Sequence, residues 1–99
     1  MISTKECAKA LREAAFHSGV DIMKIYVDKI GPRNKRGFIP SKVRRVSAWV
    51  PPCSDAKMRA MAGFVVDCGA SDVRITRGKN GFMSHYSFGY HIRCTARIG

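Results

Sequence analysis

Two stretches of this chain carry the same helix pattern, and this repetition constrains the fold more than any other feature. The first runs from Ile2 to Gly19 and the second from Cys53 to Gly69. Each begins with an apolar residue followed by a serine suited to cap a helix, and each stops at a glycine, a residue that commonly ends one. The sequence therefore predicts two capped helices, near residues 4–18 and 55–68.

Both segments place their apolar residues at the same positions. Counted from the cap serine, small or apolar residues recur at offsets 4, 7, 8, 11 and 12, which form one face of a helix. In the first segment Ser3 and Glu6 also have the spacing of a capping box. The residues expected to be buried are Cys7, Ala10, Leu11, Ala14 and Ala15, and then Met58, Met61, Ala62, Val65 and Val66.

Each helix is followed by two segments in which polar and apolar residues alternate, as in half-buried strands. These segments lie at roughly 22–28, 42–50, 72–76 and 87–98. We therefore predict a duplicated α-β-β unit with pseudo-repeats at residues 2–50 and 53–98. Two helices can cover only one face of a four-stranded sheet. We expect one α+β domain over residues 1–99, an antiparallel sheet with both helices on one face and the other face open.

The alternation also selects the side chains of the open face. A cationic sheet that carries aromatic rings is typical of proteins that stack unpaired bases and hold phosphates. A solvated surface explains the arginines, but it does not explain an exposed tryptophan among them. The residues predicted to point outward are Lys24, Tyr26, Arg45, Trp49, Arg74, His91, Arg93 and Arg97.

Two basic loops join the paired strands. The stretch "IGPRNKRGFIPSKVRR", residues 30–45, holds six cations and no acid, and "RGKNGFMSHY", residues 77–86, is also basic. From these loops we expect Arg33, Lys35, Arg36 and Lys79 to contact phosphates. The alternatives are a loop that only keeps the protein in solution, and an arm that enters a DNA groove.

The net charge of +11 on 99 residues favours a polyanionic partner, either nucleic acid or an acidic protein surface. We expect a small nucleic-acid-binding protein that favours single-stranded RNA or DNA. The first alternative is an interaction or inhibitor protein, of the kind common in phage and mobile elements, that docks on nucleic-acid-processing machinery. The choice between RNA and DNA, and the oligomeric state, stay open.

Catalytic motifs are scarce. The sequence has no P-loop, G-x-G-x-x-G, G-x-S-x-G or H-E-x-x-H pattern, so no catalytic residue, metal or cofactor is expected. The second alternative is a metal-independent RNase of toxin type that uses His85 and His91 as acid and base. The element order is similar to that of LAGLIDADG endonucleases, but their acidic helix motif is absent. The sheet also lacks the aromatic signature of an RNA-recognition motif, so no family is assigned.

The N-terminal segment is polar and amphipathic and has no apolar signal region. We therefore expect no membrane segment and a cytoplasmic location. The four cysteines, Cys7, Cys53, Cys68 and Cys94, show no metal-type spacing. In a reducing cytosol they are expected to be free thiols, with Cys7, Cys68 and Cys94 buried on apolar faces.

Overall fold

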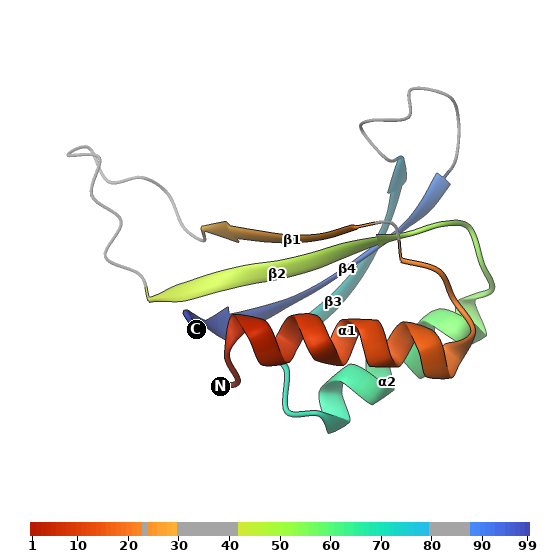
Figure 1. The fold of residues 1–99 in the computed structure, drawn as a ribbon. Coiled ribbons are helices and arrows are strands. Elements are labelled where there is room, and N and C mark those ends of the chain that lie inside the picture. Colours follow the sequence, from red (N-terminus) through yellow and green to blue (C-terminus); the bar gives the residue numbers. More distant parts are fainter. Residues whose placement is uncertain (23, 30–41, 80–87) are drawn as a thin grey trace.

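The computed structural model describes residues 1–22, 24–29, 42–79 and 88–99, and its elements follow the predicted order (Figure 1). The strands form one antiparallel sheet in the order β1-β2-β4-β3, so that β1 and β3 are the edge strands. Both helices lie on one side of the sheet and the other side is open, which confirms the predicted α+β architecture. The elements are α1 (Thr4–Ser18), β1 (Lys24–Lys29), β2 (Val43–Val50), α2 (Asp55–Asp67), β3 (Ser71–Lys79) and β4 (Phe88–Arg97).

Both helices begin at the predicted serines. The Glu6 backbone N–H donates to Ser3 Oγ at 3.2 Å, and the Ser3 N–H donates to Glu6 Oε1 at 3.4 Å, which completes the capping box. At the start of α2 the Lys57 N–H donates to Ser54 Oγ at 3.3 Å. Gly19 ends α1 with a φ of 67°, in the left-handed region that favours glycine.

The core lies between the helices and the sheet, and it contains all five residues predicted for α1. In α2, Met58, Met61 and Val65 are buried and Ala62 is half-buried. Val66 is 52% exposed, so this part of the prediction was wrong. The helix α2 packs on α1 and on the edge strand β3, and Val66 lies outside the part of α2 that these contacts bury.

Two of the four cysteines are paired, and the prediction of four free thiols was wrong. Cys7 of α1 and Cys94 of β4 are both buried, as expected, and they form a disulfide between helix and sheet. Their sequence separation of 87 concealed this contact. Cys53 and Cys68 are free, but Cys68 is exposed, because it caps the end of α2 rather than lying on its buried face.

The disulfide also bears on the expected location. Disulfides persist mainly in oxidising compartments, so the pairing of Cys7 with Cys94 differs from what a cytoplasmic location predicts, and that location stays a prediction. In the part of the chain that the structure describes, neither helix is long and apolar enough to cross a membrane.

The third strand differs most from its predicted range. It runs on through Lys79 instead of ending at Thr76, because β4 supplies a paired residue at each step as far as Phe88. Near its start β3 has a bulge, where the register shifts between Ser71 and Arg74. The strand order is symmetric about the central pair β2 and β4, but the duplication itself stays a prediction.

Candidate functional site

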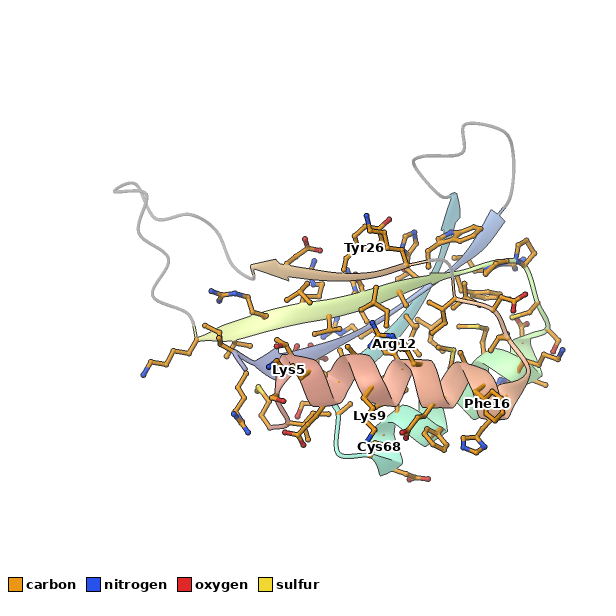
Figure 2. All side chains as sticks on the ribbon, viewed as in Figure 1. Lys5, Lys9, Arg12, Phe16, Tyr26 and Cys68 are labelled. Carbon is orange, nitrogen blue, oxygen red and sulfur yellow. A yellow bond between two sulfur atoms is a disulfide. The ribbon has the colours of Figure 1, made fainter. Side chains whose placement is uncertain are left out.

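The open face is the side of the sheet that points away from the helices, and the strand register arranges its side chains in three rows from β1 to β3. Neighbouring strands lie about 4.8 Å apart, and the rows about 7 Å apart. Figure 2 shows Tyr26, in the second row, pointing away from the helices. The rows are Lys24, Trp49, His91 and Thr76; then Tyr26, Ser47, Arg93 and Arg74; then Asp28, Arg45, Thr95 and Ser71.

A pocket of about 210 Å³ lies on this face, and three arginines line it. They come from three neighbouring strands, Arg45 from β2, Arg93 from β4 and Arg74 from β3. The alternation of each strand turns these side chains outward, and the register sets Arg74 opposite Arg93. We call this the arginine pocket; its lining is Arg45, Arg74, Arg93, Asp72, Cys94 and Thr95.

The bulge in β3 shapes one rim of the arginine pocket. It adds one residue to β3 between Ser71 and Arg74, and Asp72 there adopts a φ of 52°. Aspartate tolerates this left-handed conformation better than most residues do. The Arg74 Nε–H donates to Asp72 Oδ1 at 3.0 Å, so the rim carries one carboxylate beside the guanidinium groups.

The arginine pocket carries an excess of positive charge. Three guanidinium groups and one carboxylate give it a formal charge of +2. Arg45 and Arg93 are half-buried, and neither has a hydrogen bond or ion pair within the described ranges. The Arg74–Asp72 pair is well exposed, at 64% and 56%, and so contributes little to stability. Because guanidinium groups bind oxyanions with two parallel hydrogen bonds, the pocket can hold a phosphate or a carboxylate.

Trp49 has its predicted place on the open face, but it is only 3% exposed, so the expectation of an exposed stacking residue was wrong. Gly89 of β4 makes room for the indole, since a Cβ there would lie 2.8 Å from Trp49 Cζ2. The indole Nε1 is buried and has no hydrogen-bond partner among the described residues. Tyr26 is half-buried, with Lys24 Nζ 5.2 Å from its ring centre, and is the described aromatic residue of this face that a ligand can reach.

Arg97 also differs from the expectation. Its Nε–H donates to the Met1 carbonyl oxygen at 3.2 Å, and its Nη2 lies 3.6 Å from Glu6 Oε1. This side chain therefore ties the end of β4 to the start of α1 and does not join the arginine pocket.

Several predicted site residues fall outside what the structure describes. Arg33, Lys35, Arg36 and His85 lie outside the described residues, and so does the side chain of Lys79. Their proposed contacts stay predictions. His91 is half-buried in the first row, two residues before Arg93 on β4.

A polar contact on the helix side of the sheet was not foreseen. The Tyr90 hydroxyl donates to the Asp55 carboxylate, and the Arg77 guanidinium lies 5.6 Å from the centre of the Tyr90 ring. The hydrogen bond to Asp55, and then burial, raise the pKa of Tyr90. Arg77, expected in a loop, is therefore a strand residue that packs on a buried ring.

The sequence did not predict that the three arginines form one pocket, because they come from different strands and the sequence does not fix the order of the strands. No described group of three or more His, Cys, Asp or Glu side chains is placed to hold a metal ion. Comparisons with protein-family models, with curated proteins and with solved structures found no match for this chain.

Proposed function

We propose that this protein binds nucleic acid on its open face and that the arginine pocket holds a backbone phosphate. One observation carries the proposal: three arginines from three neighbouring strands line a single pocket of about 210 Å³. The planar fork of arginine matches phosphate oxygens in two hydrogen bonds. The net charge of +11 adds a general attraction for a polyanion.

The preferred ligand in this proposal is a single strand of RNA or DNA. Tyr26 shares a row with Arg93 and Arg74, and two strand spacings, about 10 Å, separate it from Arg93. An unpaired base can stack on Tyr26 while its backbone reaches the arginine pocket, and such stacking contributes about 1–3 kcal/mol per base. A duplex keeps its bases paired inside, so it would use the arginines alone.

Other cations extend this surface in the proposal. Lys24 and His91 lie in the row next to Tyr26 and Arg93 and can meet neighbouring phosphates. The basic loops, through Arg33, Lys35, Arg36 and Lys79, would add further phosphate contacts. Trp49 and Arg97 are left out, because one is buried and the other binds the start of α1.

Fluorescence anisotropy tests the proposal with a labelled short single-stranded RNA, the matching DNA and a duplex of the same sequence. Arg93→Ala should weaken single-strand binding by about tenfold or more, because a guanidinium leaves the pocket. Lys9→Ala is the matched control: it removes one cation from α1, in the helix layer (Figure 2), and should change affinity by less than about twofold. Equal losses in the two variants would mean that only total charge matters and would overturn the proposal.

The salt dependence of binding counts the phosphates that the pocket holds. For a single strand, each lost phosphate contact flattens the plot of log affinity against log salt by about 0.7. Because Arg45, Arg74 and Arg93 line one pocket, replacing all three with alanine should flatten it by about 0.7. A change of about 2 would mean that each arginine meets its own phosphate.

Two added measurements, binding of an acidic peptide and cleavage of RNA, separate the two alternative functions. A carboxylate fits the same guanidinium forks, so an acidic protein surface is the alternative partner. Binding of a polyglutamate peptide, with no binding of any of the three nucleic acids, would favour that partner. An RNase would add cleavage to binding, and labelled RNA left intact over hours, with and without divalent metal, would exclude it.

A further inference from the structure

The two edges of the sheet are built differently. An edge strand exposes unpaired backbone N–H and C=O groups, and proteins protect such edges with bulges and charges. β3 has a bulge between Ser71 and Arg74, with Asp72 at a positive φ. β1 pairs with β2 in an unbroken register from Lys24 to Lys29, and no described strand lies along its other side. The edge that is regular along its whole described length is therefore β1.

The residues of β1 complement a second copy of β1. If two copies pair antiparallel around Tyr26, Lys24 of each copy lies opposite Asp28 of the other, and Ile25 lies opposite Val27. Residues directly opposite in an antiparallel pair share one face of the sheet, and opposite charges or apolar residues there are stabilising. The two Lys24–Asp28 pairs and the two Tyr26 rings then meet on the open face, and the apolar pairs meet on the helix side.

The helix side of β1 has apolar surface for a partner to cover. Val27 is 52% exposed, although it lies on the same face as the buried Val46 of β2. A groove of about 450 Å³ is lined by Arg12 of α1 and by three residues in or next to β1: Ile22, Lys24 and Ile25. In the antiparallel pairing Val27 of the second copy lies opposite Ile25, at the border of this groove. Each copy would therefore cover the exposed valine and part of the groove of the other.

We propose that this chain forms a two-fold symmetric dimer by antiparallel pairing of β1 with β1 around Tyr26. The two sheets become one sheet of eight strands, and their open faces become continuous. The contact is small, so a dissociation constant of about 10–100 μM is expected. The charge of +11 on each copy opposes association. The association constant of the dimer should therefore increase at higher salt, which screens that repulsion. The dimer does not depend on nucleic-acid binding.

Sedimentation equilibrium of the full chain without nucleic acid tests the dimer, at about 0.15 M and about 0.5 M salt. The wild type should approach twice its mass of 11.0 kDa as concentration rises. Lys24→Glu and Asp28→Lys each set like charges opposite one another, and each should be monomeric. An equimolar mixture of the two variants restores both opposite-charge pairs and should dimerise, as should the double variant. Arg59→Glu and Asp67→Lys, the same charge changes at exposed positions of α2, should leave the dimer unchanged.

Several results would overturn the proposed dimer. One is a wild type that stays monomeric up to about 1 mM, far above the range expected for a specific contact. A second is a dimer that survives both β1 charge variants, and a third is a mixture that fails to restore it. If a charge variant does not fold, Val27→Thr, which keeps a β-branched residue in the strand, should still weaken association by about tenfold. Undiminished association of that variant would also overturn the proposal.

Discussion

Replacing Gly89 with alanine should destabilise the fold, because neighbouring atoms already occupy the space that a Cβ needs. That Cβ would lie 2.2 Å from the Val50 carbonyl oxygen and 2.8 Å from Trp49 Cζ2. The indole can shift, but the backbone oxygen belongs to the central strand β2 and cannot move without disturbing the sheet. Overpacking a filled site costs about 1–3 kcal/mol, and a backbone contact this close places the expected cost near about 3 kcal/mol. In a domain of this size the midpoint of thermal unfolding should then fall by about 12 °C or more.

Gly63→Ala is the matched control for this experiment. Gly63 lies in α2, and a Cβ there would meet no atom within 4 Å. Alanine is favoured over glycine in a helix interior by about 0.5–1 kcal/mol, so this variant should melt a few degrees above the wild type. Circular dichroism follows both transitions. A Gly89→Ala variant that melts at or above the wild type would refute the packing of Trp49 against Gly89 and return Trp49 to the candidate stacking residues.

Three further predictions follow from particular contacts. Reduction of the disulfide between Cys7 and Cys94, with its sequence separation of 87, should lower the free energy of unfolding by about 4–5 kcal/mol in the chain-entropy account, and an unchanged urea midpoint would contradict this. Tyr90→Phe removes the hydroxyl that donates to Asp55. The hydrogen bond raises the folded-state pKa of Tyr90. The contribution of this hydrogen bond to stability is therefore complete below the unfolded pKa of about 10 and is lost as the pH rises through the folded value. The variant should therefore be less stable at neutral pH and lose less stability in alkali, and an equal alkaline loss would count against the contact. Asp72→Asn removes the carboxylate at the rim of the arginine pocket and keeps a residue that tolerates its φ of 52°, so affinity for single-stranded RNA should rise by about threefold; a fall would contradict the pocket's role.

The local features of the fold could be predicted from the sequence because each depends on neighbouring residues. Ser3 and Glu6 are three residues apart, so their capping box is visible in the sequence and is confirmed by the hydrogen bonds. The alternation of each strand assigned Arg45, Arg74 and Arg93 to the open face, and the register confirms that assignment. Helix caps and the face of a strand on which a residue lies depend on the residue's own segment, so both were predictable.

The contacts between distant segments could not be predicted in this way. The three arginines form one pocket only because β4 lies between β2 and β3, and no local pattern fixes that order. The burial of Trp49 depends on Gly89, which lies on a different strand and would leave no room for the indole if it carried a Cβ. The disulfide likewise depends on how α1 crosses β4. The residues of the open face were therefore predictable, and their grouping into the arginine pocket was not.

The most direct test of the arginine pocket is to map the amide NMR signals of the protein that change when a short single-stranded RNA is added. We expect the largest changes at Arg45, Arg74, Arg93 and Thr95, smaller changes at Tyr26, and none along the outer side of α1. Changes confined to the helix layer, with the open face unaffected by RNA, would contradict the proposed site.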